Sequence, residues 1–189
     1  MSASGNLSFA GAAARAGLLA CLCALSGCGE AGPDAAGARE ALHALLLEAA
    51  QRDFRTDQAM RDHDAEAAAE RKARGEKPFA SPPPLPPFEV RIEAFELLSA
   101  ERAPTEAAGP DGALWNVEAH CKVYVGGLET GIKTMTLTGG MNMLKYGQYG
   151  FEGRYRFALR RVPGASADAA PRWEIVAPKG RRALARSEP

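Results

Sequence analysis

Apolar residues recur at helical spacing in the segment 38–77, and they predict a helix over roughly residues 35–73. Five residues at three- and four-residue intervals form its apolar face: Leu42, Leu45, Leu46, Ala49 and Ala50. This face must pack against other apolar surface. The second half, Arg61 to Lys77, is charged nearly all round, so we expect it to project into solvent. One helix over the full stretch would measure roughly 60 Å, so a break near Thr56 and Asp57 is the alternative.

The segment 88–177 changes to the alternating pattern of β-strands. Residues 115–125 show this pattern most clearly, with six positions on one side: Trp115, Val117, Ala119, Cys121, Val123 and Val125. Residues 89–98 change parity between Ile92 and Phe95, which predicts a bulge or a strand buried on both faces. Three further strands are predicted at Ile132–Thr138, Tyr149–Val162 and Trp173–Val176. Gly153 inside the second of these predicts a bend.

Proline and charge mark the connections and the end of the chain. Residues 78–87 contain SPPPLPP, whose prolines lack backbone donors and favour polyproline II, so we interpret this segment as a stiff spacer rather than a ligand for a partner domain. Residues 178–189 are basic and are expected to form a disordered tail. One helix followed by about five strands predicts an α+β fold, with the N-terminal helix packed on a curved antiparallel sheet. This element order is similar to that of cystatin-like and nuclear-transport-factor-like rolls.

The first 27 residues have a different pattern. Arg15 precedes an apolar run from Ala16 to Leu25, and a run of about ten apolar residues suits the hydrophobic region of a signal peptide but is too short to cross a bilayer. The run ends in Leu25-Ser26-Gly27-Cys28, which resembles the lipobox of bacterial lipoproteins. The alternative is an ordinary secretory signal that contains a cysteine by chance.

The resemblance to bacterial lipoproteins implies that residues 1–27 are a signal peptide and that cleavage precedes Cys28. It also implies that Cys28 carries diacylglycerol on its sulfur and an acyl group on its new amine. Residues 28–37 are then a lipidated tether of mostly small and polar residues. Several acyl chains anchor a protein stably, whereas one chain does not. Gly29, in place of Asp, implies the periplasmic face of the outer membrane if the source is Gram-negative.

Charge and cysteine content take on a different meaning once residues 1–27 are removed. The whole chain has 189 residues, with 23 basic and 23 acidic side chains. The remaining 162 residues hold 22 basic and 23 acidic side chains, because the removed segment contains one arginine and no acid. This balance argues against nucleic acid as a partner. Only Cys121 remains as a free thiol, so we expect no internal disulfide.

Candidate chemistry is sparse along the chain. The three histidines, His43, His63 and His120, do not share ligand spacing on one element, so we predict no metal site and no cofactor. Cys121 directly follows His120, which suggests a thiolate–imidazole pair. Adjacent side chains of a strand point to opposite faces, however, so we expect Cys121 to be a small buried residue.

Glu118, His120 and Tyr124 share the outer face of the predicted 115–125 strand. On a half-exposed sheet they are ordinary surface residues. If the sheet curls around them, they would instead line a polar pocket that binds or turns over a small molecule. We therefore expect a cell-envelope protein, anchored in the membrane by lipid and without catalytic activity, that binds an envelope protein or an envelope polymer. The pocketed roll is the alternative hypothesis.

Overall fold

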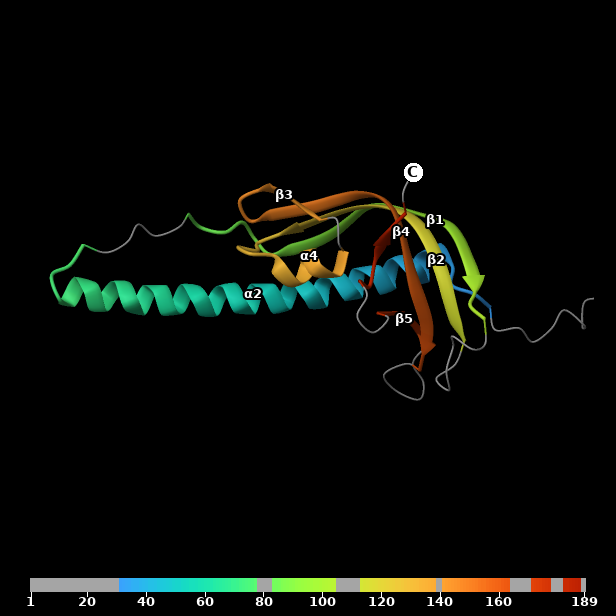
Figure 1. Cartoon of the computed structure of the whole chain (residues 1–189), viewed down its shortest axis with the longest axis horizontal. Helices are drawn as coiled ribbons and strands as arrows, with labels where there is room; N and C mark the ends of the chain where they lie inside the picture. Colours follow the sequence, from blue (N-terminus) through green and yellow to red (C-terminus); the bar gives the residue numbers. More distant parts are fainter. Residues whose placement is uncertain are drawn as a thin grey trace, which may run out of the picture. The chain divides into compact units, whose positions relative to one another are not determined.

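The computed structural model describes residues 31–77, 83–104, 113–138, 141–163, 171–177 and 182–187. Among the described residues, two helices and six strands follow one another: α2 (Ala35–Ala73), β1 (Glu89–Arg102), β2 (Leu114–Gly126), α4 (Ile132–Thr138), β3 (Asn142–Lys145), β4 (Gln148–Val162), β5 (Arg172–Val176) and β6 (Ala185–Arg186). The compact unit that contains these helices and strands begins at Gly32. The long helix packs on an open antiparallel sheet, which confirms the predicted α+β fold (Figure 1).

The sheet has six strands rather than about five, and β4 is its organising strand. One edge of β4 pairs with β2 along the whole length of β2. The other edge pairs in turn with β3 at residues 148–150, with β6 at residues 155–156 and with β5 at residues 158–162. Three short strands therefore cover an edge that would otherwise expose a long row of backbone hydrogen-bonding groups.

The pairing of β1 with β2 explains the parity change in the sequence. The register shifts once between Ile92 and Ala94 and again between Leu97 and Ser99. The first shift brings Phe95 opposite Cys121, on the same core-facing side as Ile92. The predicted bulge is therefore confirmed, and it keeps the apolar side chains of β1 directed toward the core.

The helix α2 is a single uninterrupted element of 39 residues, so the alternative of a break at residues 56–57 is wrong. The carboxylate of Asp34 caps its start by accepting a hydrogen bond of 2.8 Å from the backbone N–H of Gly37. Arg71 and Lys72 lie in its last turn, where positive charge is favourable.

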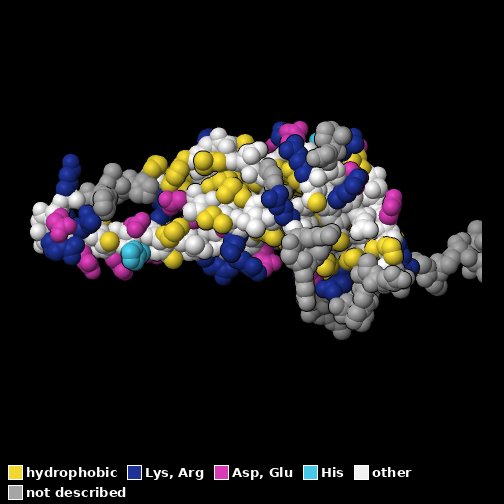
Figure 2. Space-filling view, viewed as in Figure 1, with side chains coloured by type: hydrophobic (Ala, Val, Ile, Leu, Met, Phe, Trp, Pro, Cys, Tyr) yellow, Lys and Arg dark blue, Asp and Glu magenta, His cyan; other side chains and the backbone are white. Residues whose placement is uncertain are grey.

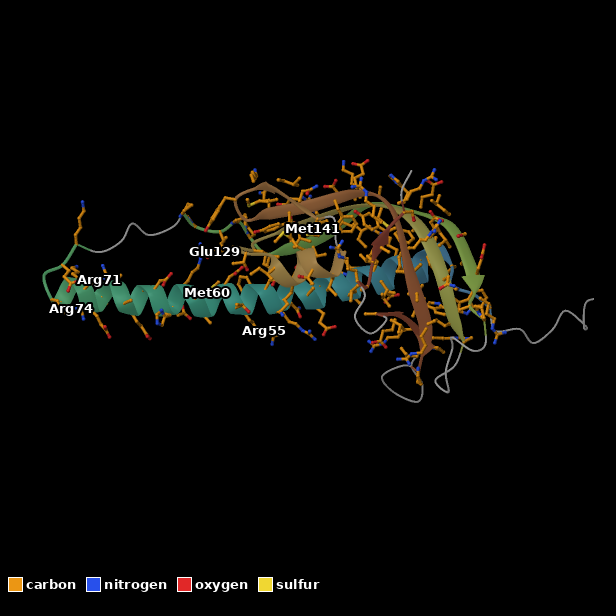
Figure 3. The ribbon with its side chains drawn as sticks, viewed as in Figure 1. Arg55, Met60, Arg71, Arg74, Glu129 and Met141 are labelled. Carbon is orange, nitrogen blue, oxygen red and sulfur yellow. The ribbon has the colours of Figure 1, made fainter. Side chains whose placement is uncertain are left out.

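The two halves of α2 differ in burial as the sequence predicted. Six small or apolar residues of the first half pack into the core or lie buried beside it: Ala38, Ala41, Leu42, Leu46, Ala49 and Ala50. The last buried residue of the helix is Asp57. Beyond it the helix continues past the end of the sheet, and Figure 3 places Arg71 and Arg74 on that distal part.

The inner faces of β2 and β4 supply most of the remaining core. Their buried side chains share one face of the sheet: Val117, Ala119, Cys121, Val123, Val125, Tyr149, Phe151, Tyr155, Phe157 and Leu159. Gly153, with φ +148°, lies opposite Cys121 in this face and leaves it without a side chain at that point. The strand β4 thus contains the irregular glycine that the sequence indicated.

The prediction of a strand over Ile132–Thr138 is wrong, because this segment is the helix α4. Alternating threonines suggested a strand, since β-branched residues favour extended backbone. Tertiary contacts override that preference here. Gly131 turns the chain with φ +56°, and a carboxylate of α2 accepts hydrogen bonds from the first backbone N–H groups of α4.

The disordered tail expected over residues 178–189 does not hold for residues 182–187. Ala183 and Leu184 are buried, and the backbone N–H of Leu184 donates to the carbonyl of Leu137 at 3.2 Å. The strand β6 then pairs with β4. Arginines flank this short stretch on both sides, so the three apolar residues between Arg182 and Arg186 gave little signal. Within the expected spacer 78–87, residues 78–82 lie outside the described part and residues 83–87 have no helix or strand.

Candidate functional site

The three residues of the predicted pocket lie on the outer face of β2, each with different neighbours. Glu118 pairs with Arg156 of β4 at 3.3 Å. The guanidinium of Arg91 lies 4.5 Å from the ring centre of Tyr124. His120 lies between Glu96 and Arg154 in the register of the sheet.

No cavity among the described residues brings these three side chains together. A surface depression borders Glu118, but His120 and Tyr124 do not line it. Its other charged residues are Glu101, Arg156 and Arg182. Residues two apart on a strand are separated by about 7 Å, and Glu118, His120 and Tyr124 each remain partly exposed. The arrangement therefore matches a surface row of separate pairs better than a convergent pocket.

Cys121 lies in the core, as the alternation of β2 predicted. Its side chain has no solvent exposure, and His120 lies on the opposite face of the same strand. Burial raises the pKa of the Cys121 thiol from its ordinary value of 9.0 to about 12. The thiol is therefore neutral in the folded protein at physiological pH and forms no pair with the neighbouring imidazole.

The raised pKa of Cys121 predicts a loss of stability at alkaline pH. The folded thiol stays neutral up to about pH 12, whereas the unfolded thiol ionises near pH 9. The stability that the buried neutral thiol contributes is fully present below pH 9. It declines by about 1.4 kcal/mol per pH unit between pH 9 and about pH 12. Urea unfolding measured at about pH 8 and pH 11 should show that the free energy of unfolding falls further between these two pH values for the parent protein than for Cys121→Ala. Equal falls would contradict the burial of a neutral thiol.

Two buried carboxylates on α2 accept several hydrogen bonds from one distant segment of the chain. Asp53 and Asp57, here called the carboxylate pair, are 2% and 0% exposed. They are four residues apart and so lie on one face of the helix, at the end of the buried stripe. Charged side chains are almost never this buried unless their oxygens are paired.

The carboxylate pair binds the chain between β2 and α4. Asp57 accepts hydrogen bonds from the backbone N–H of Glu129 at 2.6 Å and from the Thr130 hydroxyl at 2.9 Å. Asp53 accepts from the backbone N–H of Lys133 at 2.8 Å and from Thr134 through both its backbone N–H and its hydroxyl. Asp53 therefore caps α4 from another helix, and both carboxylates hold the 129–134 segment against α2.

A third contact extends this attachment to the β3–β4 hairpin. The guanidinium of Arg61 binds Glu129 at 2.9 Å and also donates to the hydroxyl of Tyr146 at 3.1 Å. The hydrogen bond with Glu129 raises the pKa of Arg61 above its ordinary value. Figure 3 shows Glu129 at the edge of the sheet that faces α2 near Met60. These contacts serve the fold, since every oxygen of the carboxylate pair is occupied by the protein's own donors.

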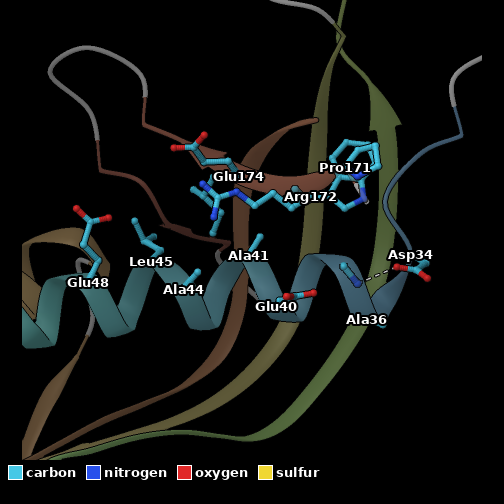
Figure 4. Close-up of a pocket in the computed structure, with 13 residues that line it drawn as sticks. Asp34, Ala36, Glu40, Ala41, Ala44, Leu45, Glu48, Pro171, Arg172 and Glu174 are labelled. Atoms are coloured by element: carbon cyan, nitrogen blue, oxygen red, sulfur yellow. Dashed lines mark hydrogen bonds between the residues drawn. The ribbon is translucent and has the colours of Figure 1, made fainter. Parts of the chain in front are cut away.

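A groove separates the first turns of α2 from β5 (Figure 4). It has a cavity volume of about 550 Å³. Its charged lining consists of four acids and one base: Asp34, Glu40, Glu48, Glu174 and Arg172. Trp173 closes over the helix at Gly37, where an added Cβ would lie 2.6 Å from the indole ring. The excess of carboxylates favours cationic groups over anions in this groove.

An exposed apolar edge lies at the turn between β3 and β4. Met143, Leu144 and Tyr146 are 62%, 61% and 41% exposed. Apolar side chains gather over this end of the molecule in the space-filling view (Figure 2). This surface was not predicted, because residues 141–148 lie between the predicted strands Ile132–Thr138 and Tyr149–Val162 and show no regular pattern of their own.

Several expectations about sites fall on or outside the limits of the described residues. Cys28 and the residues before it lie outside the described part. Within the described ranges, no group of three or more His, Cys, Asp or Glu side chains is placed to hold a metal ion. No helix in those ranges is both long enough and apolar enough to span a bilayer. Comparison of the chain with family models, with curated proteins and with solved structures found no match.

Proposed function

We propose that this chain is a lipid-anchored protein of the cell envelope that acts as a non-catalytic binding or structural module. The observation that carries the proposal is the order of features at its start. Arg15, the apolar run and the LSGC tetrapeptide ending at Cys28 occur together and in the order that bacterial lipoproteins use. Lipid on Cys28 would hold the protein at a membrane, and the periplasmic face of the outer membrane is the expected place in a Gram-negative source.

The start of the folded unit suits a short tether. The helix α2 is capped by Asp34, only six residues after Cys28. Six extended residues span at most about 20 Å. A lipid on Cys28 would therefore keep the first turns of α2, and the acidic groove beside them, within that distance of the bilayer surface.

Several charged side chains are paired within the protein, and this supports a binding or structural role rather than catalysis. Glu118 is held by Arg156, and both carboxylates of the carboxylate pair are saturated by backbone and hydroxyl donors. A general acid or base needs instead a proton-transfer position within reach of a substrate. The exposed apolar side chains of Met143, Leu144 and Tyr146 and the distal half of α2 are available for a partner protein or an envelope polymer.

Metabolic labelling with palmitate tests the anchor. The parent protein is expected to incorporate label, and Cys28→Ala is expected to lose it completely, because the cysteine sulfur is the site of lipid attachment. Cys23→Ala is the matched control, since Cys23 lies in the segment that cleavage would remove. Labelling that persists in Cys28→Ala would refute the proposed anchor.

Substitutions on the outer face of β2 distinguish the binding module from the pocketed roll. Glu118→Ala and His120→Ala are each expected to change the free energy of unfolding by less than about 1 kcal/mol, because exposed ion pairs contribute little. Neither is expected to alter the phenotype of cells that depend on the protein. Normal folding combined with a strong loss of that phenotype would favour the alternative, in which Glu118, His120 and Tyr124 serve a small-molecule site.

A further inference from the structure

The β3–β4 hairpin exposes apolar side chains that the fold does not use. Met143 and Leu144 are each more than 60% exposed, and Tyr146 is 41% exposed at the turn that follows. Among the described strands, β3 pairs only with β4, so its second edge is free. Hairpin turns in water usually carry polar residues, and a cluster of exposed apolar side chains marks a contact surface.

The start of α4 adds to this edge on the side of Met143, which faces α2, whereas Leu144 lies over Gly150 on the outer face of the sheet. Tyr149 of β4 is the register partner of Met143, and the ring of Tyr149 lies against Gly131. The next residue, Ile132, is 57% exposed. We define the hairpin edge as Met143, Leu144, Tyr146 and Ile132, together with two exposed lysines beside them, Lys133 and Lys145.

The charges around the hairpin edge favour a negatively charged surface. The nearby acids are already engaged, because Glu129 pairs with Arg61 and the carboxylate pair is buried against backbone donors. In the part of the chain that the structure describes, the ammonium groups of Lys133 and Lys145 have no acidic partner. Exposed apolar side chains beside unpaired lysines are the combination that binds an anionic bilayer.

We propose that the hairpin edge docks onto the surface of an anionic phospholipid bilayer and forms a second membrane contact besides the lipid on Cys28. This inference rests on the proposed lipid anchor. The few side chains of the edge would bind a membrane only weakly by themselves, but an anchor in the same bilayer raises their effective concentration. The lysines suit the headgroup region, where their ammonium groups stay hydrated, whereas the Tyr146 hydroxyl is already held by Arg61.

The length of α2 sets the geometry of this attachment. Arg61, which binds the hydroxyl of Tyr146, lies 27 residues after the N-cap Asp34. That separation is about 40 Å along the helix at 1.5 Å per residue. Figure 1 shows β3 at the other end of the sheet from the start of α2. Attachment at both ends would lay the first half of α2 along the membrane rather than upright on it.

A fluorescent label at position 144 tests the docking. Leu144→Cys is labelled with an environment-sensitive fluorophore in the full lipidated protein, where Cys121 is buried and does not compete. The protein is then reconstituted into vesicles of phosphatidylcholine alone or mixed with phosphatidylglycerol. Leu98→Cys on β1 is the matched control, because Leu98 is also a partly exposed leucine on a strand. Flotation of the vesicles reports the anchor independently.

Docking predicts a blue shift and a several-fold loss of quenching by an aqueous quencher for the label at 144 in phosphatidylglycerol vesicles. The label at 98 should remain quenchable, and Lys133→Glu with Lys145→Glu should abolish the difference while leaving the circular dichroism unchanged. Protein that floats but keeps the label at 144 fully quenchable would overturn the docking and leave the anchor standing. Protein that does not float would overturn both. Protection seen in intact cells but not in lipid vesicles would identify a protein partner and overturn docking on lipid.

Discussion

Asp57→Ala is expected to lower the free energy of unfolding by about 3 kcal/mol, the larger of the two main effects predicted from this structure. Asp57 is fully buried, and its carboxylate accepts hydrogen bonds from the backbone N–H of Glu129 and from the hydroxyl of Thr130. Alanine would leave these donors without a partner and would open a small cavity between α2 and the segment that leads into α4. Urea unfolding followed by circular dichroism measures the change.

Asp62→Ala is the matched control for this prediction. Asp62 lies on the same helix a little over one turn later, but it is exposed and bonded only to Gln58 at 2.9 Å. Its removal should cost less than about 0.5 kcal/mol, as for most surface substitutions. If Asp57→Ala destabilises the protein no more than Asp62→Ala does, the carboxylate pair does not hold the 129–134 segment in solution.

Gly127→Ala is expected to cost about 2–3 kcal/mol, because the site combines a strained backbone with a close contact. Gly127 has φ +80°, and an added Cβ would lie 2.5 Å from the Cα of Phe88. Backbone atoms cannot move aside as the end of a flexible side chain can. The loss should appear as a lower midpoint of urea unfolding with an unchanged slope.

Gly75→Ala separates the two causes. Gly75 has a similar φ of +76°, but apart from its chain neighbours no atom of the described residues lies within 4 Å of the position of its added Cβ. Its substitution should therefore report backbone strain alone, about 1 kcal/mol. A cost for Gly127→Ala equal to that for Gly75→Ala would show that the chain before β1 does not pack against the turn after β2.

Regular patterns in the sequence were sufficient to predict the main layers of the fold. The apolar stripe from Leu42 to Ala50 predicted the buried half of α2, and strict alternation predicted β2 with Cys121 on its inner face. The parity change between Ile92 and Phe95 predicted the bulge in β1. Each of these signals is local and periodic, so it depends little on which distant segment becomes the neighbour.

The errors arose where a distant residue decides local structure. Threonine alternation favours a strand over Ile132–Thr138, but Asp53, some eighty residues earlier, caps this segment as a helix. In sequence, Asp53 and Asp57 are two acids among many on a charged helix, and nothing local distinguishes them. Leu184 packs into the core and its backbone N–H donates to the carbonyl of Leu137, contacts that the basic composition around it does not suggest.

For the candidate sites, too, local patterns were predictive and contacts with distant segments were not. Glu118, His120 and Tyr124 were correctly placed on one strand face, since alternation alone decides that. Whether side chains converge depends on the curvature and cover of the sheet, which no short motif specifies. The exposure of Met143 and Leu144 depends likewise on which strand edge remains unpaired.

Mass spectrometry of the N-terminus of the protein isolated from cell membranes tests the lipid anchor. The expected first residue is Cys28, with residues 1–27 absent and with the mass of a diacylglycerol group and an amide-linked acyl chain added to that residue. An N-terminus at any other position, or an unmodified Cys28, would contradict the lipid anchor and the membrane docking that rests on it.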